Sequence, residues 1–293
     1  MSAGAGVPLP HMALAFVGFT LWTVGDALVH ALEGRPPVAV AFWVSVAGLA
    51  ALLALSPRLG GLAQTFRTPY QGLQWARGLA LAISGLLTIY AFMSLPLATA
   101  YALVFVQPFC AKALSAVLTG ERPRPAAWAA SAVGFAGVLI VLRPGLVPIS
   151  WPALAALGSA GFFALGYVLT RHIGQANQTT LGTAIYRHIL SLALLPLLAG
   201  GPGGLALVPA DLPWVAVIGL FGVGGILTVS RAFAAAPAAY VSPVHYTQIL
   251  WGVAFGALFF GEVPDAWTVA GAAVIIAAGL WLASGARTKQ EAP

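Results

Sequence analysis

The stretch "SLPLATAYALVFVQPFCAKALSAVLTGERP" at residues 94–123 returns in altered form as "AAPAAYVSPVHYTQILWGVAFGALFFGEVP" at residues 235–264. Each copy has a proline near its start and then a long apolar run that ends in Gly-Glu-x-Pro. At a constant offset of 141 residues (262 minus 121) the two copies align without a gap. The identical pairs include Pro96 and Pro237, Ala98 and Ala239, Gln107 and Gln248, Gly120 and Gly261, Glu121 and Glu262, and Pro123 and Pro264. One register held over this length predicts an internal duplication of the chain.

The same offset aligns residues far upstream of this stretch. The further pairs are Trp22 and Phe163, Gly25 and Gly166, Leu28 and Leu169, and Gly78 and Gly219. The duplication therefore extends over almost the whole sequence. We expect two related units, residues 1–148 and residues 149–293, and we call them the first and second halves.

The composition predicts that both halves lie in a membrane. Hydrophobic residues make up 60% of the 293 residues, charged residues only 7%, and the mean hydropathy is +0.94. A water-soluble globule of this size could not bury so much apolar surface. Successive apolar runs predict an all-α polytopic membrane protein of ten transmembrane helices. These are 12–32, 37–55, 74–95, 99–118, 125–142, 153–171, 181–199, 213–236, 240–260 and 266–284.

An odd number of helices in each half has a consequence for topology. After five crossings the second half enters the membrane in the opposite direction to the first, which predicts an inverted repeat about an axis in the membrane plane. Transporters commonly have this architecture. Two equivalent halves of opposite orientation can exchange conformations, so a site at their interface can open first to one side and then to the other.

The basic residues predict how the chain is oriented. With the N-terminus inside, the outer loops would hold only Arg35 and Arg143. The inner loops and the tail would hold Arg58, Arg67, Arg122, Arg124, Arg171, Arg287 and Lys289. Because cytoplasmic loops carry an excess of Lys and Arg, we expect both termini in the cytoplasm. The opening "MSAGAGVPLPHM" lacks the basic region of a secretory signal, so the first apolar run is expected to remain as a helix.

The two quoted segments resemble the drug/metabolite transporter superfamily, and specifically its ten-helix EamA-type carriers, in which each half has a proline-started fourth helix that ends in Gly-Glu-x-Pro. Within that group the chain is most similar to bacterial exporters of aromatic amino acids. The resemblance implies export of aromatic or large apolar amino acids from a bacterial inner membrane, with membrane lipid as the other partner and no nucleic acid. It also implies that the fifth and tenth helices, 125–142 and 266–284, lie at the periphery.

Two pairs of repeat mates predict a substrate site near the membrane midplane. Gln107 and Gln248 each stand about eight residues into a predicted helix, and helical rise places them near mid-depth. Trp22 and Phe163 reach a similar depth. Aromatic walls with amide groups would suit a moderately apolar zwitterion. The alternative is that the rings fill helix interfaces and the glutamines bridge helices.

Further candidates lie on the predicted first, third, fourth and ninth helices. His245 and Gln248 are separated by about 60° around a helix, so they can share one cavity face. Tyr90 and Tyr101 would line an outward vestibule or belong to an interfacial aromatic belt. Asp26 follows Trp22 by one helical turn and is the only carboxylate inside any predicted span.

Asp26 leaves several roles open. A buried acid can exchange protons as a cavity fills with water, which makes Asp26 a candidate for proton coupling. It could instead be a charged residue of a wide vestibule, or bind a substrate ammonium group. His30, one turn further on, is expected at the membrane interface. A proton-coupled exporter of drugs or other metabolites is therefore the alternative function.

Several cationic or protonatable residues are predicted to lie near the cytoplasmic side of the membrane. Lys112, Arg187, His188 and Arg231 could receive a substrate carboxylate, although Lys and Arg near a helix end also extend toward water. Each Gly-Glu-x-Pro is expected to form a helix-ending turn. The sequence has no H-E-x-x-H, G-x-S-x-G or P-loop motif. We therefore expect no enzyme activity, no metal and no cofactor, with an intramembrane enzyme as a remote alternative.

Overall fold

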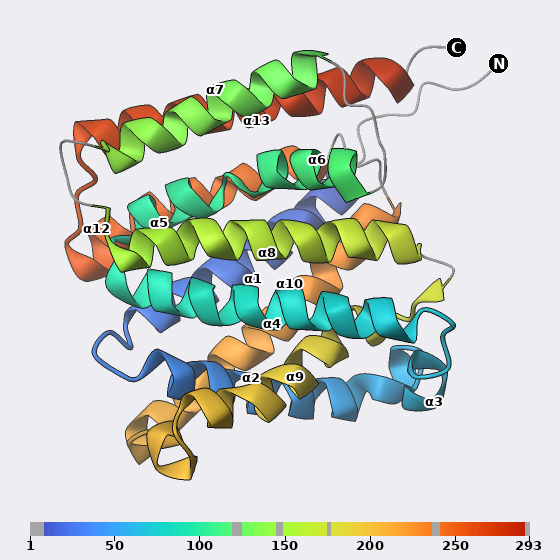
Figure 1. The fold of residues 1–293 in the computed structure, drawn as a ribbon. Coiled ribbons are helices and arrows are strands. Elements are labelled where there is room, and N and C mark those ends of the chain that lie inside the picture. The colour runs from blue at the N-terminus through green and yellow to red at the C-terminus, as the bar shows by residue number, and fades with distance from the viewer. Residues whose placement is uncertain (1–8, 119–124, 145–148, 175–176, 236–240, 291–293) are drawn as a thin grey trace.

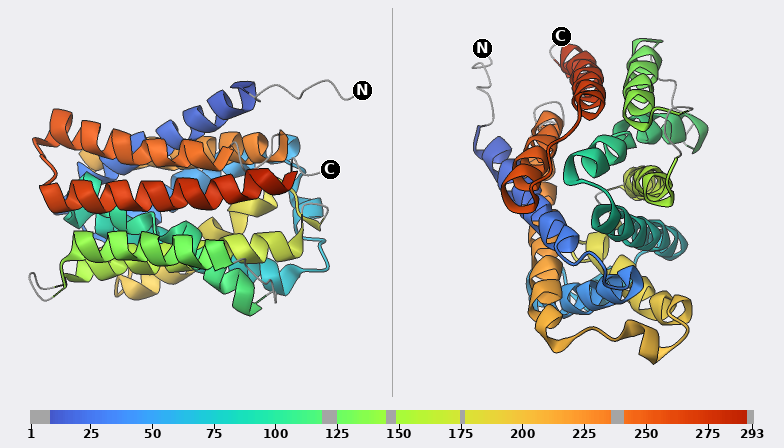
Figure 2. Two further views of the ribbon diagram at one scale, coloured as in Figure 1. Left: turned by 90° about the horizontal axis from the view of Figure 1, so that it is seen from above. Right: turned by 90° about the vertical axis from the view of Figure 1, so that its left-hand side faces the viewer.

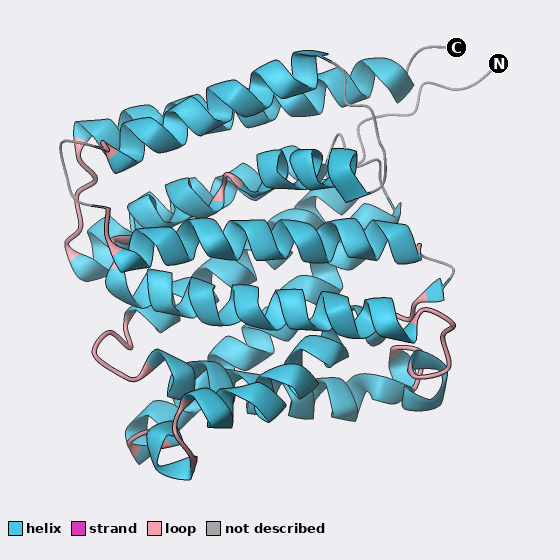
Figure 3. Cartoon of the chain, viewed as in Figure 1, coloured by secondary structure: helices cyan, strands magenta, loops and turns pink. Residues whose placement is uncertain are grey.

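The computed structural model describes residues 9–118, 125–144, 149–174, 177–235 and 241–290 (Figure 1). Within these ranges the chain forms helices joined by loops and turns (Figure 3). The α-helices are α1 Leu9–His30, α2 Pro37–Leu55, α3 Leu62–Thr65, α4 Gln71–Ser94, α5 Leu97–Val104, α6 Gln107–Leu118, α7 Pro125–Leu142, α8 Trp151–Ile173, α9 Gly182–Leu198, α10 Leu212–Ala235, α12 Thr247–Phe260 and α13 Ala266–Gln290. The 3-10 helices are η1 Ser56–Arg58, η3 Pro202–Leu205, η4 Pro209–Asp211 and η5 Ser242–Tyr246.

The length and apolar character of these helices support a multi-pass membrane protein. In the described ranges, six segments are long and apolar enough to cross a membrane. They are Leu9–His30, Pro37–Arg58, Gln71–Ser94, Leu97–Leu118, Trp151–Ile173 and Pro209–Phe233. Shorter apolar helices cover Trp128–Leu142, Gly182–Leu198 and Ala266–Trp281. Helices thus occupy the predicted spans, but not all of them reach full crossing length.

The long helices lie side by side, with their ends gathered at two faces of the bundle (Figures 1 and 2). The most extensive contacts are those of α1 with α10, α4 with α8, and α7 with α13. Each of these pairs joins a helix of the first predicted half to one of the second, so the halves interlock. The paired α7 and α13 form one edge of the bundle, which agrees with the peripheral position expected for 125–142 and 266–284 (Figure 1).

The span predicted at 99–118 is two helices in the structure. The helix α5 ends at Val104, a turn follows at Phe105 and Val106, and α6 begins at Gln107. Pro108 explains the break, because proline has no N–H to donate to the Val104 carbonyl and its ring crowds that group. The Phe109 N–H donates to Val106, three residues back, and the Cys110 N–H donates to the same carbonyl in a regular helical bond.

The span predicted at 240–260 is also irregular at its start. The 3-10 helix η5 precedes α12, and Pro243 lies within η5. Under the 141-residue offset, the beginning of α6 at Gln107 corresponds to Gln248, the second residue of α12. Both copies of the repeated stretch therefore begin a new α-helix at nearly equivalent places, after a turn in the first copy and after a 3-10 helix in the second.

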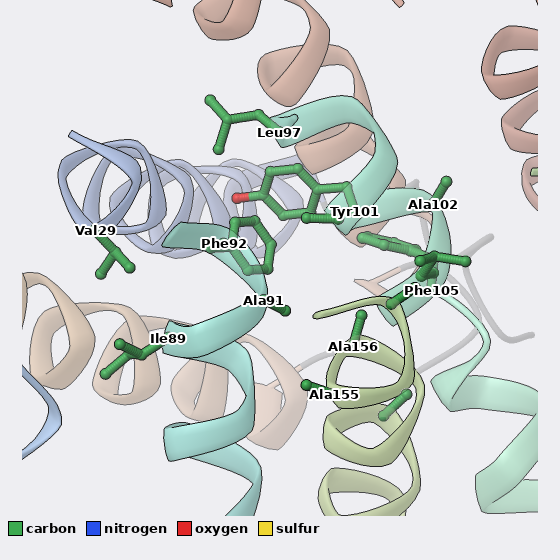
Figure 4. Packing of buried hydrophobic residues seen from close by; sticks show 14 of the residues in the cluster. Val29, Ile89, Ala91, Phe92, Leu97, Tyr101, Ala102, Phe105, Ala155 and Ala156 are labelled. Atoms are coloured by element: carbon green, nitrogen blue, oxygen red, sulfur yellow. The ribbon is translucent and has the colours of Figure 1, made fainter. Parts of the chain in front are cut away.

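A buried apolar core surrounds the first of these breaks. Figure 4 shows Phe92 of α4, Tyr101 of α5 and Phe105 of the turn lying together, with Ala155 and Ala156 of α8 alongside. The alanines let the helices approach closely. This packing fixes the position of the break relative to α1, α4 and α8.

Candidate functional site

Aromatic rings gather where both repeated stretches are irregular. The His245 ring of η5 lies 4.5 Å from the Phe105 ring and 4.5 Å from the Phe19 ring of α1. The Phe19 ring meets the edge of Trp22 at 5.7 Å, and Tyr246 lies 5.3 Å from Phe105. We call these five residues the ring cluster. It joins α1, the α5–α6 turn and η5, and so spans both halves of the sequence.

Two predicted site residues tie helices together at this cluster. The buried Gln248 donates from Nε2 to the Phe19 carbonyl at 3.3 Å, linking α12 to α1. Trp22 donates from Nε1 to the Gly222 carbonyl at 3.1 Å, linking α1 to α10. Gln107 stands half-buried at the first position of α6, directly after the turn that carries Phe105. The helix-bridging role considered for the glutamines is thus present for Gln248.

Tyr101 and Asp26 form a hydrogen-bonded pair beside the cluster. The Tyr101 hydroxyl donates to Oδ2 of Asp26 at 2.7 Å, and the tyrosine is only 2% exposed. Of the two positions considered for Tyr101, a vestibule or an aromatic belt, neither describes its packing in full, because the ring lies in the core against Phe92. Gly252 of α12 makes room for that ring, since a Cβ at Gly252 would overlap it.

The structure does not bring every predicted residue to the ring cluster. Tyr90 on α4 and Phe163 on α8 are half-buried. Within the described residues, neither ring packs against another aromatic ring. Trp22, His245 and Gln248 do come together, and Tyr101 is next to them through its contact with Phe105 at 6.2 Å. The site therefore draws more on the first, fourth and ninth predicted helices than on the third and sixth.

One glutamate of the repeated motif has a role that the sequence did not suggest. Oε1 of Glu262 lies 3.0 Å from Nε2 of His30, and Oε2 accepts the backbone N–H of Leu97 at 2.9 Å. Nδ1 of His30 donates to the Phe92 carbonyl, 2.6 Å away. His30 is the last residue of α1 and is only 7% exposed, because both of its ring nitrogens contact protein oxygen atoms at this end of the bundle.

The turn itself agrees with expectation in the copy that can be described. Gly261 ends α12 in the left-handed conformation with φ at 68°, and the next N–H donates to Gly256 at 2.9 Å. This geometry favours glycine because it has no Cβ. The first copy, Gly120, Glu121 and Pro123, lies outside the described residues, as do Pro237 and Ala239.

Two more ion pairs lie at the same end of the bundle as His30, which we call the His30 end. Nε of Arg35 lies 2.7 Å from Oδ2 of Asp211, and Nη1 of Arg143 lies 2.8 Å from Oδ2 of Asp265. Asp265 precedes α13 and has its pKa lowered by the N–H of Thr268, which donates at 2.7 Å, and by the nearby Arg143. Like His30 and Glu262, each pair joins the first half to the second.

The opposite end, which we call the Arg77 end, is held by polar contacts between the halves. Arg77 of α4 is 1% exposed and donates to Oε1 of Gln178 at 2.6 Å and to the Gly182 carbonyl. The Tyr186 hydroxyl donates to the Thr65 carbonyl at 2.9 Å. Sequence reasoning missed Arg77, although an arginine inside the predicted span 74–95 was a visible signal.

Comparisons with known proteins agree with this architecture. A model of the EamA-like transporter family matches residues 9–143 and again residues 150–284. A riboflavin transporter of Rhizobium johnstonii is 32% identical, with 96% of this chain and 92% of that protein covered. The pseudopaline exporter CntI of Pseudomonas aeruginosa is 30% identical, with 94% and 96% covered.

A solved crystal structure has the same fold, with a TM-score of 0.62 at 19% identity, and 97% of this chain and 99% of that chain are covered. The relatives named above are transporters, and neither name mentions amino acids. The family model covers nearly the whole chain in two consecutive matches. The chain belongs to the EamA-like transporter family.

Proposed function

We propose that this chain is a ten-helix carrier of two inverted halves, divided near residues 148 and 149, that moves aromatic metabolites across a bacterial inner membrane by alternating access. In this count α5 with α6, and η5 with α12, each form one crossing. Two consecutive family matches support the two halves. The bacterial relatives support the membrane, and both termini are assigned to the cytoplasm on the charge distribution alone.

The pattern of helix contacts supports a pseudo-two-fold relation. The 141-residue offset carries α1 onto α8 and α4 onto α10, so the pair α1 and α10 corresponds to the pair α8 and α4. Both pairs are in extensive contact. In the same way α2 with α10 corresponds to α9 with α4, and α1 with α12 corresponds to α8 with α6. Inverted repeats place substrate at such an interface, often beside broken helices.

The observation that carries the substrate proposal is the contact between Phe105 and His245 at 4.5 Å. These two rings come from the irregular parts of the two repeated stretches, and Phe19 and Trp22 extend the aromatic surface. Aromatic rings attract a flat aromatic solute by stacking and edge contacts. Trp22, Gln107, His245 and Gln248 are the proposed substrate contacts, with Tyr90, Tyr101 and Phe163 at the margins of the path.

Two kinds of aromatic substrate have specific support. Export of aromatic or large apolar amino acids follows from the sequence resemblance and from a site with both rings and amide groups. Riboflavin is the second candidate, because a relative of 32% identity carries that name. Asp26, hydrogen-bonded to Tyr101 next to the ring cluster, is the proposed coupling residue if transport is driven by protons.

The test is flux into proteoliposomes that contain the purified chain. Radiolabelled phenylalanine, tryptophan, riboflavin, threonine and a cationic dye are compared with and without an imposed pH gradient. The proposal expects saturable flux of one or more of the first three compounds. Flux of threonine alone would contradict the aromatic site. Flux of the dye alone, driven by the gradient and lost in Asp26→Asn, would replace the proposal with a proton-coupled drug exporter.

A further inference from the structure

Arg187 extends toward the middle of the bundle instead of toward its nearer end. Its helix α9 begins at Gly182, at the Arg77 end, and the preceding residue Tyr186 lies against Gly78 of α4. The guanidinium, however, lies against Gly85, where a Cβ would be 3.0 Å from Nη2. Gly85 is about two helical turns, or about 10 Å, further along α4 than Gly78. The extension toward water that long basic side chains often show is not what this structure has.

The guanidinium lacks a protein counter-ion in the described part of the chain. None of the ion pairs there involves Arg187, and its Nε is buried with no hydrogen-bond partner. The acid inside the predicted spans, Asp26, is hydrogen-bonded to Tyr101. Nδ1 of the adjacent His188 is also buried without a partner, and its ring lies against Gly48 of α2. A cation held inside a membrane protein without an anion is costly unless it serves a mobile one.

The depth of this cation matches that of the ring cluster. Gly85 stands near the middle of α4, and Trp22 stands near the middle of α1. These two helices are in contact and both start at the Arg77 end of the bundle. A solute at the level of the rings is therefore also at the level of the guanidinium.

We propose that Arg187, positioned by Gly85 and flanked by His188, binds the carboxylate of an aromatic carboxylate substrate. Guanidinium groups bind carboxylates through two parallel charge-assisted hydrogen bonds, which fits this role. The aromatic part of this substrate rests on the proposed function. The binding of an anion at Arg187 does not depend on that function and can be tested separately. Between the two candidates it favours aromatic amino acids, because riboflavin carries no carboxylate.

The test uses phenylacetate and phenylacetamide, which share a shape and differ in charge. The full-length protein in detergent is titrated with each compound, and thermal stabilisation gives the apparent affinity. We expect the wild-type protein to prefer phenylacetate by about tenfold or more, since hydrogen bonds to charged groups are among the stronger ones. Arg187→Gln is expected to remove this preference. The exposed Arg67, in the loop before α4, supplies the matched control, Arg67→Gln, which is expected to keep it.

A second variant leaves the charge in place. In Gly85→Ala the added Cβ would stand 3.0 Å from Nη2, so the guanidinium has to shift by a few tenths of an ångström, and the preference for phenylacetate is expected to fall although Arg187 remains. Equal affinities for the two compounds in the wild-type protein, or an unchanged preference in both Arg187→Gln and Gly85→Ala, would overturn the proposal.

The flux assay separates this inference from the proposed function. Riboflavin flux without any preference for phenylacetate would refute the carboxylate site and leave the aromatic carrier standing. A preference that depends on Arg187, together with no flux of any aromatic compound, would support the anion site and refute the aromatic carrier.

Discussion

The carboxylate of Glu262 lies 3.0 Å from Nε2 of His30, and a hydrogen bond between these two atoms needs one proton between them. The other carboxylate oxygen accepts the N–H of Leu97, the first residue of α5. One side chain of the second half thus holds the end of α1 and the start of α5 in the first half. In the second copy of the Gly-Glu-x-Pro motif, the glycine therefore forms the turn, and the glutamate links the second half to the first.

Removing this carboxylate is expected to destabilise the His30 end. In Glu262→Ala, the Leu97 N–H and Nε2 of His30 lose their partner, and each buried unsatisfied group costs about 1–3 kcal/mol. Thermal unfolding in detergent measures the effect. Glu33→Ala, which removes an exposed carboxylate in the loop after α1, is the control and should leave the melting temperature nearly unchanged. An equal loss of melting temperature in the two variants would contradict a stabilising role for the contacts of Glu262 with His30 and Leu97.

The Arg143–Asp265 pair has a defined pH dependence. The pKa of Asp265 is lowered from its ordinary 3.8, first by the Thr268 N–H and then by Arg143. A lowered pKa adds stability above the unfolded pKa, and that stability is lost as pH falls through the folded pKa. The difference in melting temperature between wild type and Asp265→Asn should therefore stay constant from pH 7 to pH 5. A difference that disappears within that range would refute this assignment.

Gly252 is expected to tolerate no side chain. An alanine there would meet the Tyr101 ring and disturb its hydrogen bond to Asp26, so Gly252→Ala should lower stability by about 1–3 kcal/mol, as overpacking does. Flux per molecule should fall as well. Gly161→Ala in α8 is the control, because a Cβ at that position has open space around it. Flux and stability are measured on the same preparations, and similar behaviour of the two variants would argue against tight packing at Tyr101.

The helix break at Pro108 should matter more for transport than for folding. Pro108→Ala supplies an N–H for the Val104 carbonyl and allows α5 and α6 to join, which should raise stability by up to about 3 kcal/mol. The joined helix would move Phe105 away from His245, so flux is expected to fall. Pro125→Ala is the control, because Pro125 is the first residue of α7, where proline is well tolerated. This variant should change neither stability nor flux. Higher flux in Pro108→Ala would contradict a functional break.

Much of the fold could be predicted because membrane helices are local in sequence. Apolar runs located α1, α2, α4 and α7 to within a few residues, and the offset between the repeated stretches paired Gln107 with Gln248. The break at Phe105 was missed, although Pro108 is a known helix breaker, because the apolar run continues through it without interruption.

The contacts between the halves could not be predicted from spacing. The place of His30 near a helix end says nothing about its partner Glu262, 232 residues later (262 minus 30). Tyr101 looked like a vestibule residue because helical periodicity does not show which neighbour carries Asp26. The first pair joins the two halves and the second joins two helices of the first half, and both depend on how helices far apart in the sequence pack, which helical spacing leaves open.

The central claim is that aromatic solutes cross at the ring cluster, and variants at Trp22 and Gln248 test it most directly. Initial rates of phenylalanine and riboflavin flux are measured in proteoliposomes for Trp22→Ala and Gln248→Ala, with the exposed Trp128→Ala as control. We expect flux of the carried compound to fall by about fivefold or more in the first two, since each aromatic contact or hydrogen bond contributes about 1 kcal/mol or more, and to stay near wild type in the third. Wild-type flux in both Trp22→Ala and Gln248→Ala, at equal protein content, would show that the solute does not cross at this site.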